Sequence, residues 1–263
     1  MELLDDCLPE NDFSQRMPDQ KQVFQNIKMI VKPFLNLMVS IEKKGLQNIP
    51  EKGGAILVGN HRSDMDPFIV ASVVPRYISW IAAEYTERIP IFKNLIRETG
   101  VIPMDISGNV TVSSIKRLMG VLKSGELLGI FPEGHDYMVQ NDFAAPMVSF
   151  HSGFAIFAYR ARVPIIPFSL IPLEEEIEAM PVPTQLRQLM GLPEEVCNIP
   201  QRSNYKKVRV VFGAGLEPEE FTARPEKEAL PYIQDRIREA MLQLQTTEGL
   251  LTNDEAKTEA ITA

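Results

Sequence analysis

The feature that most constrains the fold is a series of short, almost wholly apolar runs separated by stretches with helical spacing. The runs are 55–58 (AILV), 77–82 (YISWIA), 127–131 (LLGIF), 164–170 (PIIPFSL) and 208–212 (VRVVF). Strands that are apolar on both faces occur in sheets that are covered by helices, and strands alternating with helices are typical of α/β layer folds. The sequence therefore predicts an α/β fold with a two-layer mixed sheet and helices.

The segments between these runs predict the helices and the domain limits. Helical spacing or end signals mark 67–74, 91–98, 112–123, 153–161 and 225–244. We expect one folded domain over 45–245, in which the irregular, charged residues 174–207 form an insertion or lid. Residues 1–20 are polar, acidic and proline-containing, and residues 246–263 are also acidic, so we expect both segments to be disordered tails.

Residues 21–44 predict an N-terminal amphipathic helix or helix pair. Apolar side chains recur at helical spacing from Val23 to Ile41, and Pro33 predicts a kink or a split. Lysines 21, 28, 32 and 43 lie along one edge of the apolar face, where they could reach lipid phosphates. Two interpretations remain open, a helix packed on its own domain and an interfacial membrane anchor.

Composition narrows the class of protein. The net charge is −8 over 263 residues, and residues 21–44 are the segment that is clearly basic, so a nucleic-acid partner is not expected. The sequence contains no run of 18 apolar residues, so we expect no membrane-spanning helix. It contains no cationic start followed by an apolar stretch, so we expect no signal peptide. With two cysteines and no metal-binding motif, we expect a reducing compartment, no metal and a location at the cytoplasmic face of a membrane, peripheral or monotopic.

Two predicted strand ends carry polar residues where ligands gather in open α/β sheets. They are 60–66 (NHRSDMD) and 132–136 (PEGHD), and they hold two of the three histidines. His61 and Asp66 are five residues apart, but a turn of the chain between them would let the carboxylate reach an imidazole nitrogen and orient a general base. The alternative is that Asp66 only caps a helix and His61 is a loop residue.

Four short blocks in order resemble the glycerolipid acyltransferase family, the lysophosphatidate acyltransferase-like enzymes. The blocks are GNHRSDMDP at 59–67, GVIPMD at 100–105, FPEG at 131–134 and VPIIP at 163–167. The resemblance covers roughly residues 40–245 and implies an α/β core with an N-terminal helical anchor. It implies transfer of a fatty acyl group from acyl-CoA or acyl-carrier protein to a lipid hydroxyl, with no cofactor.

The resemblance also implies roles for individual residues. His61 corresponds to the general base and Asp66 to the carboxylate that orients it, while Asn60 belongs to the same block. Glu133 and Gly134 correspond to residues that help hold the acyl acceptor. The remaining substrate-binding candidates are Arg62, His135 and Asp105.

Two departures from the family pattern leave the acceptor open. Ile106 and Asp136 stand where arginines are usual, so two cations for a lysophosphatidate phosphate are missing. Either other cations replace them or the acceptor is a glycolipid, a neutral lipid or another lipid alcohol. The candidate cations are Arg62, Lys116, Arg117, Arg160 and Arg162.

Three functions fit the sequence. An O-acyltransferase needs a base to remove the proton of the alcohol, and backbone N–H groups near the histidine are expected to stabilise the oxyanion. A thioester or lipid hydrolase would use the same pair to activate water. A non-catalytic lipid-binding relative is the third, although Asn60, His61, Asp66 and Glu133 are all present.

Overall fold

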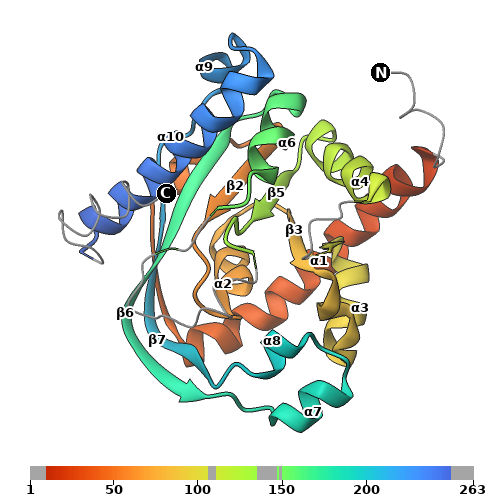
Figure 1. The fold of residues 1–263 in the computed structure, drawn as a ribbon, viewed down its shortest axis with the longest axis vertical. Coiled ribbons are helices and arrows are strands. Elements are labelled where there is room, and N and C mark those ends of the chain that lie inside the picture. Colours follow the sequence, from red (N-terminus) through yellow and green to blue (C-terminus); the bar gives the residue numbers. More distant parts are fainter. Residues whose placement is uncertain (1–9, 106–110, 135–146, 148–149, 250–263) are drawn as a thin grey trace.

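The structure, a computed structural model, describes residues 10–105, 111–134, 147 and 150–249, and it contains one mixed sheet (Figure 1). The strands are β1 (Ser40–Lys44), β2 (Ala55–Gly59), β3 (Ile78–Ala83), β4 (Ile102–Met104), β5 (Leu127–Ile130), β6 (Ile165–Ala179) and β7 (Gln201–Phe212). Their order is β1-β7-β6-β2-β5-β3-β4. Neighbours pair in parallel except β6 and β7, so β1 and β7 run against the other strands.

Helices cover both faces of this sheet. In β2, Ile56 and Val58 join the core formed with α4 (Val112–Lys123), α6 (Gly153–Ala161) and α10 (Glu226–Thr247). Ala55 and Leu57 point the other way and pack with α2 (Asp66–Val73). The predicted α/β class with a mixed sheet is confirmed, and α2 adds a helical layer to the predicted two. The other helices are α3 (Pro90–Thr99), α7 (Thr184–Leu189), α8 (Glu194–Cys197), α9 (Pro218–Thr222), η1 (Leu46–Asn48) and η2 (Glu84–Arg88).

The N-terminal helix both begins and ends earlier than the predicted range 21–44, because residues 40–44 form strand β1 and pair with β7. Helix α1 spans Glu10–Met38 without a break and includes Pro18 and Pro33, so residues 10–20 are helical rather than disordered, and Pro33 does not split the helix. Its side chains Met17, Phe24 and Leu35 are buried against the domain. The burial of Met17 stabilises the helical conformation of the acidic segment in which it lies. No helix within the described ranges is long and apolar enough to cross a membrane.

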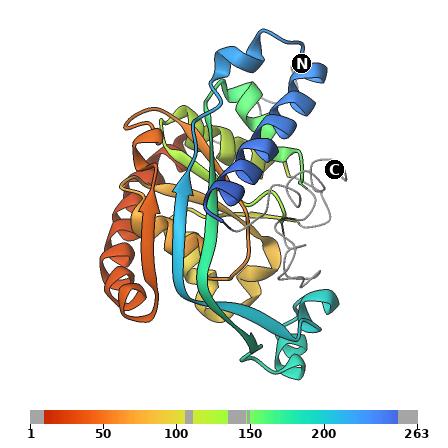
Figure 2. The ribbon, with the colours of Figure 1, turned by 90° about the vertical axis from the view of Figure 1, so that its left-hand side faces the viewer.

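Residues 174–207 are regular rather than irregular. Strands β6 and β7 continue past the sheet as a long antiparallel pair, the β6–β7 arm, which runs side by side down the molecule (Figure 2). Opposite charges pair across it, for example Lys206 with Glu176 at 3.0 Å, which explains why this segment is charged. At its end α7 and α8 fold back, and Val196 and Ile199 pack on Tyr85. Residues 248–249 follow α10, whereas 250–263 lie outside the described residues.

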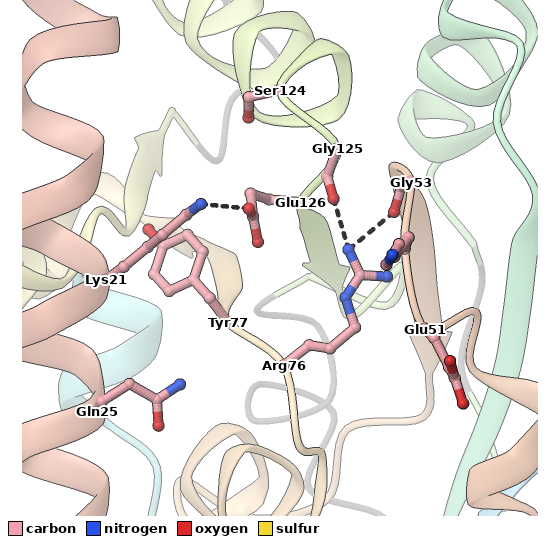
Figure 3. Close-up of a pocket in the computed structure, with 10 residues that line it drawn as sticks. Lys21, Gln25, Glu51, Gly53, Arg76, Tyr77, Ser124, Gly125 and Glu126 are labelled. Carbon is pink, nitrogen blue, oxygen red and sulfur yellow. Dashed lines mark hydrogen bonds and ion pairs between the residues drawn. The ribbon is translucent and has the colours of Figure 1, made fainter.

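A pocket of about 560 Å³ opens where the parallel strands begin (Figure 3). Arg76 donates to the carbonyls of Pro50 at 2.7 Å, Gly53 at 2.8 Å and Gly125 at 2.5 Å, and so joins the turns before β2 and β5. Lys21 of α1 forms an ion pair with Glu126 across the same pocket. The charged groups of Arg76, Lys21 and Glu126 are thus bound to other parts of the protein. Their contacts attach α1 to the sheet and join the turns before β2 and β5.

Candidate active site

The candidate site lies at the opposite end of the sheet, where β2 ends. A β-carbon at Gly59 would lie 2.1 Å from the Phe168 ring, so the last residue of β2 has to be glycine for β6 to pack beside it. The chain then turns through residues 60–65 and enters α2 at Asp66, followed by Pro67. This turn places the polar block NHRSDMD at the carboxyl edge of the central strands, the region where α/β proteins bind ligands.

The carboxylate of Asp66 organises this turn. It is fully buried, and its Oδ2 atom accepts the backbone N–H of Arg62 at 2.6 Å and of Ser63 at 2.8 Å. The same oxygen lies 2.8 Å from Nδ1 of His61, so the expected contact between the two side chains is present. The Tyr205 hydroxyl donates to the second oxygen, Oδ1, at 3.0 Å. Asp66 therefore shapes the loop from inside rather than only starting a helix.

The His61 ring is held in one orientation. Its side chain is 14% exposed, and it stacks on Phe131 with ring centroids 4.1 Å apart, while Phe131 stacks in turn on Trp80 at 5.0 Å. An ionised carboxylate that already accepts two backbone N–H groups can only accept from the imidazole as well, which places a proton on Nδ1. The lone pair is then on Nε2, the nitrogen that a general base needs.

Glu133 connects the FPEG turn to the histidine loop. It is buried, and its Oε1 atom accepts the backbone N–H of His61 at 2.8 Å. The next residue, Gly134, has a φ of 62°, a conformation that favours glycine. The His151 ring lies against this turn, about 3.2 Å from where a β-carbon of Gly134 would be, and its backbone N–H bonds to Pro132. Glu133 thus contacts the main chain of His61 directly.

Asn60 joins two strands rather than pointing into open space. Its amide nitrogen donates to the carbonyl of Leu170 at 3.2 Å, and its amide oxygen accepts the backbone N–H of Leu170 at 2.8 Å. Only an amide side chain can make this pair of bonds with one residue of a neighbouring strand. The role in substrate binding stays a prediction, while a role in fixing β2 to β6 follows from the contacts.

Arg62 is engaged by the β6–β7 arm. Its guanidinium group forms a two-fold contact with Glu175, with Nε donating at 2.9 Å, and Ser203 also donates to this carboxylate at 2.6 Å. Burial alone would lower the pKa of Arg62, but the bond and the charge of Glu175 outweigh it and raise that pKa. Burial likewise opposes ionisation of Glu175, yet the donors Arg62 and Ser203 leave its pKa below the usual range. Each charge is stabilised by the other.

The other predicted residues are spread over a wider area. Asp105 directly follows β4 at the same carboxyl edge, whereas Ile106, His135 and Asp136 lie outside the described residues. Arg160 pairs with Glu226 at 3.0 Å, and it lies with Arg162 just before β6 begins, at the opposite edge from His61. Lys116 and Arg117 lie on α4, where Arg117 donates to the carbonyl of Val101 at 3.3 Å.

Five further residues of the site come from positions that the sequence did not single out for this role. They are Trp80, Phe131, Glu175, Ser203 and Tyr205. The sequence does contain a signal for Phe131, because this residue begins the FPEG block at one of the two polar strand ends. Tyr205 and Ser203 belong to the segment expected to be irregular, and no pattern in a single sequence connects residue 205 with residue 66.

The backbone donors close to His61 are already in use. The N–H groups of Arg62 and Ser63 serve Asp66, and that of His61 serves Glu133. The expected stabilisation of an oxyanion by the loop backbone therefore cannot come from these three groups while the carboxylates hold them. Among the described residues, no group of three or more His, Cys, Asp or Glu side chains is arranged to bind a metal ion.

Comparison with known proteins adds a family to this geometry. A family model described as Acyltransferase matches residues 40–171. A 1-acyl-sn-glycerol-3-phosphate acyltransferase of Helicobacter pylori is 29% identical over 134 residues, 51% of this chain and 54% of that protein. One of Borreliella burgdorferi is 33% identical over 100 residues, 36% of this chain and 39% of that protein. An uncharacterized protein of Mycobacterium tuberculosis is 28% identical over 179 residues, 62% of this chain and 47% of that protein.

The chain thus spans about half the length of the curated relatives it matches. Among solved structures, it is similar to the 1-acyl-sn-glycerophosphate (LPA) acyltransferase PlsC from Thermotoga maritima, with a TM-score of 0.57 and 21% identity. That similarity covers 86% of this chain and 81% of the other. At this level of identity the comparison supports the fold.

The pair formed by Arg62 and Glu175 predicts a pH-dependent contribution to stability. Because the pKa of Glu175 is lowered in the folded state, its contribution is present above the ordinary carboxyl pKa and is lost as the pH falls through the lowered value. We expect Glu175→Gln to lower the free energy of unfolding by about 1–3 kcal/mol at neutral pH, and by much less in acid. Urea unfolding at both pH values measures the difference.

The matched control is Glu176→Gln, because Glu176 is 59% exposed and pairs with Lys206 on the surface of the same arm. Its effect should stay within about 0.5 kcal/mol at either pH. A loss for Glu175→Gln that is as large in acid as at neutral pH would show that the pair does not act through its charge.

Proposed function

Because the chain belongs to the acyltransferase family, we propose that it transfers a fatty acyl group from acyl-CoA or acyl-carrier protein to the hydroxyl group of a lipid. The observation that carries the proposal is the distance of 2.8 Å between His61 Nδ1 and Asp66 Oδ2, with the ring at the carboxyl edge of the sheet. The similarity to two 1-acyl-sn-glycerol-3-phosphate acyltransferases favours a lysophosphatidate-like glycerolipid as the acceptor.

The proposed reaction needs one base and no cofactor. An alcohol is a weak nucleophile at neutral pH, so Nε2 of His61 removes the hydroxyl proton as the oxygen attacks the thioester carbon. Asp66 stabilises the imidazolium that forms, because its carboxylate accepts the proton on Nδ1. When the carbon–sulfur bond breaks, the imidazolium returns the proton to the leaving thiolate, and His61 is neutral again.

A hydrolase is the first alternative, because water could replace the alcohol in the same reaction. The His61–Asp66 pair would activate either nucleophile, and its geometry alone does not distinguish them. The nucleophile depends on whether a lipid hydroxyl occupies the position next to Nε2. The two functions therefore differ in one measurable property, the dependence of donor consumption on the acceptor.

An acceptor without a phosphate monoester is the second alternative, and the charges near the site favour it. Arg62 is paired with Glu175 and is not available as an unpaired cation. Arg160 and Arg162 precede β6 at the far edge of the sheet, which leaves Lys116 and Arg117 of the five candidates. A dianionic phosphate requires several such donors. A glycolipid or a neutral lipid alcohol would not.

We also propose that α1 lies in the surface of a membrane, which would place the chain at its cytoplasmic face as a peripheral or monotopic protein. Helix α1 has two faces in its C-terminal half: Leu35 is buried against the domain, while the other face is apolar and exposed. This exposed stripe consists of Met29, Ile30, Phe34, Leu37 and Met38, each between 64% and 85% exposed. Exposed apolar groups at this density mark interaction sites, and a lipid surface accommodates a single helical stripe.

The lysines contribute less to this contact than the sequence suggests. Lys21 pairs with Glu126, and Lys28 donates to the carbonyl of Val74, so both point toward the protein. Lys32 and Lys43 remain exposed and can reach lipid phosphates. In Figure 1 the C-terminal half of α1 lies toward the end of the molecule to which β6 runs. Because β2 is parallel to β6, the edge that carries His61 faces the same way.

The general base is tested by His61→Ala. General-base assistance accelerates a reaction roughly 10²–10⁴-fold, so we expect turnover with labelled acyl-CoA to fall by at least about 100-fold. His61 is partly exposed, so the variant should fold, which thermal unfolding checks. A folded variant with wild-type turnover would contradict the mechanism, and a wild-type protein that binds lipid without forming either product or free acid would indicate a non-catalytic relative.

The acceptor is tested by a series with one labelled donor. Donor consumption should require an acceptor; release of free fatty acid at the same rate without one would identify a hydrolase. A charge-assisted hydrogen bond contributes about 1.5–3 kcal/mol, or at least about tenfold in rate. Since Arg62 is paired and Arg160 and Arg162 lie at the far edge, two of the five candidate cations remain, and we expect lysophosphatidate to exceed neutral or glycolipid acceptors by less than that. A larger preference would show that lysophosphatidate is the acceptor.

The membrane contact is tested by Leu37→Glu, which places a charge in the exposed stripe of α1 where 85% of the residue is accessible. We expect binding to anionic vesicles in a sedimentation assay to fall several-fold while the thermal stability of the protein is unchanged. Val112→Glu is the control, because Val112 is also an exposed apolar residue, 48% accessible, at the start of α4. Equal losses for both variants would show that only net charge matters.

A further inference from the structure

The buried carboxylate of Asp66 has one partner from outside its own loop. Its Oδ2 atom faces His61, Arg62 and Ser63, all within five residues of it. Its Oδ1 atom accepts from the hydroxyl of Tyr205, which is 139 residues away on β7. The two oxygens of a carboxylate share one charge and one plane, so a bond to one of them affects what the other presents to the histidine.

Tyr205 is fixed in place by its surroundings. It is 2% exposed and packs in the core between the sheet and α2, so its ring cannot move away from Asp66 without opening that core. Burial, and next the negative charge of Asp66, raise the pKa of Tyr205 well above the ordinary phenol value. The hydroxyl therefore keeps its proton at neutral pH, and it acts as a permanent donor to Asp66.

We infer that Tyr205 is a positioning residue of the candidate site, whose hydroxyl sets the plane and the charge of the Asp66 carboxylate that faces His61. This inference rests on the proposed function, in which His61 takes the proton. The bond from Tyr205 draws charge toward Oδ1, so that Oδ2 holds the imidazole in place without stabilising the imidazolium too strongly. A base that held its proton too strongly would be occupied before the alcohol arrived.

Other charged groups around the pair stay the same when Tyr205 changes. From the loop come Arg62 and the exposed Asp64, from β6 comes Glu175, and from the FPEG turn comes Glu133, with His151 beside it. Arg62 and Glu175 neutralise each other, and Glu133 is bound to the backbone N–H of His61. Replacing tyrosine by phenylalanine removes one hydroxyl and leaves these groups in place.

The experiment compares Tyr205→Phe with the matched control Tyr77→Phe. Tyr77 is also buried, and its hydroxyl donates to the carbonyl of Thr99 at 2.9 Å, at the other end of the sheet. Each variant loses one buried phenol bond, so both should lose similar thermal stability. Only Tyr205→Phe leaves the carboxylate beside His61 with one donor fewer.

The primary measurement is the NMR titration of the imidazole of His61, assigned by its absence from the spectrum of His61→Ala. In Tyr205→Phe the carboxylate carries more charge toward the ring and favours the imidazolium. We therefore expect the titration midpoint to rise by about 0.5 pH unit or more, and to stay at the wild-type value in Tyr77→Phe. The acidic limb of the pH–activity profile should move by the same amount.

The outcomes separate this inference from the proposed function. An unchanged midpoint in Tyr205→Phe, or an equal rise in Tyr77→Phe, overturns the positioning role. A midpoint that rises while the pH–activity profile stays in place supports the positioning role and contradicts His61 as the base. A midpoint that rises while the wild-type protein shows no acyl transfer supports the positioning role and contradicts the proposed function.

A second substitution covers the case in which Tyr205→Phe does not fold. Replacing all six tyrosines by 3-fluorotyrosine retains every hydroxyl, and fluorine makes the phenol a stronger donor. The midpoint of His61 should then move in the opposite direction, to lower pH. A fluorinated protein that titrates at the wild-type midpoint overturns the inference.

Discussion

The constraint on which the site depends is the burial of a charged carboxylate. Asp66 has no exposed surface, and a buried charge is tolerated only when hydrogen bonds replace the water that it has lost. The chain meets this requirement locally, by turning residues 61–63 so that two backbone N–H groups and one imidazole face a single oxygen. The position of His61 is therefore a consequence of satisfying Asp66, and the conformation of the loop and the orientation of the imidazole ring have the same cause.

The β6–β7 arm fixes this loop from a second direction. Leu170 holds Asn60, Glu175 holds Arg62, the carbonyl of Ser203 accepts from Ser63, and Tyr205 donates to Asp66. These four contacts follow one another along the loop and along the two strands. A long antiparallel pair is stiff along its length because each strand restrains the other, so the arm is suited to hold several loop residues in register.

The sequence predicts the parts of this structure that depend on local pattern. Apolar runs locate all the central strands, and the proline after Asp66 locates α2, because burial and backbone preference are encoded within a few residues. The sequence does not predict that residues 10–20 continue α1 or that 174–207 form paired strands. Charged residues such as Glu176 and Lys206 follow no strand pattern within their own segments. Their opposite charges form a regular set of pairs only when β6 and β7 lie opposite each other. Likewise, spacing suggests that His61 meets Asp66, but nothing local indicates that Tyr205 completes the set.

The family match covers one part of the candidate site and ends before the other part. The family model matches residues 40–171, which include both His61 and Asp66 but end before Glu175, Ser203 and Tyr205. The matched segment thus contains His61, Asp66 and the first part of β6 with Leu170, while Glu175 and the two β7 residues that contact the loop lie beyond it. Arg62 shows the consequence: its charge, which in isolation suggests a phosphate ligand, is neutralised by a residue of the arm. For Arg62, the partner that neutralises the charge is therefore Glu175 of the arm, a residue outside the family blocks, and this pairing leaves Lys116 and Arg117 of α4 as the candidate cations for an acceptor phosphate.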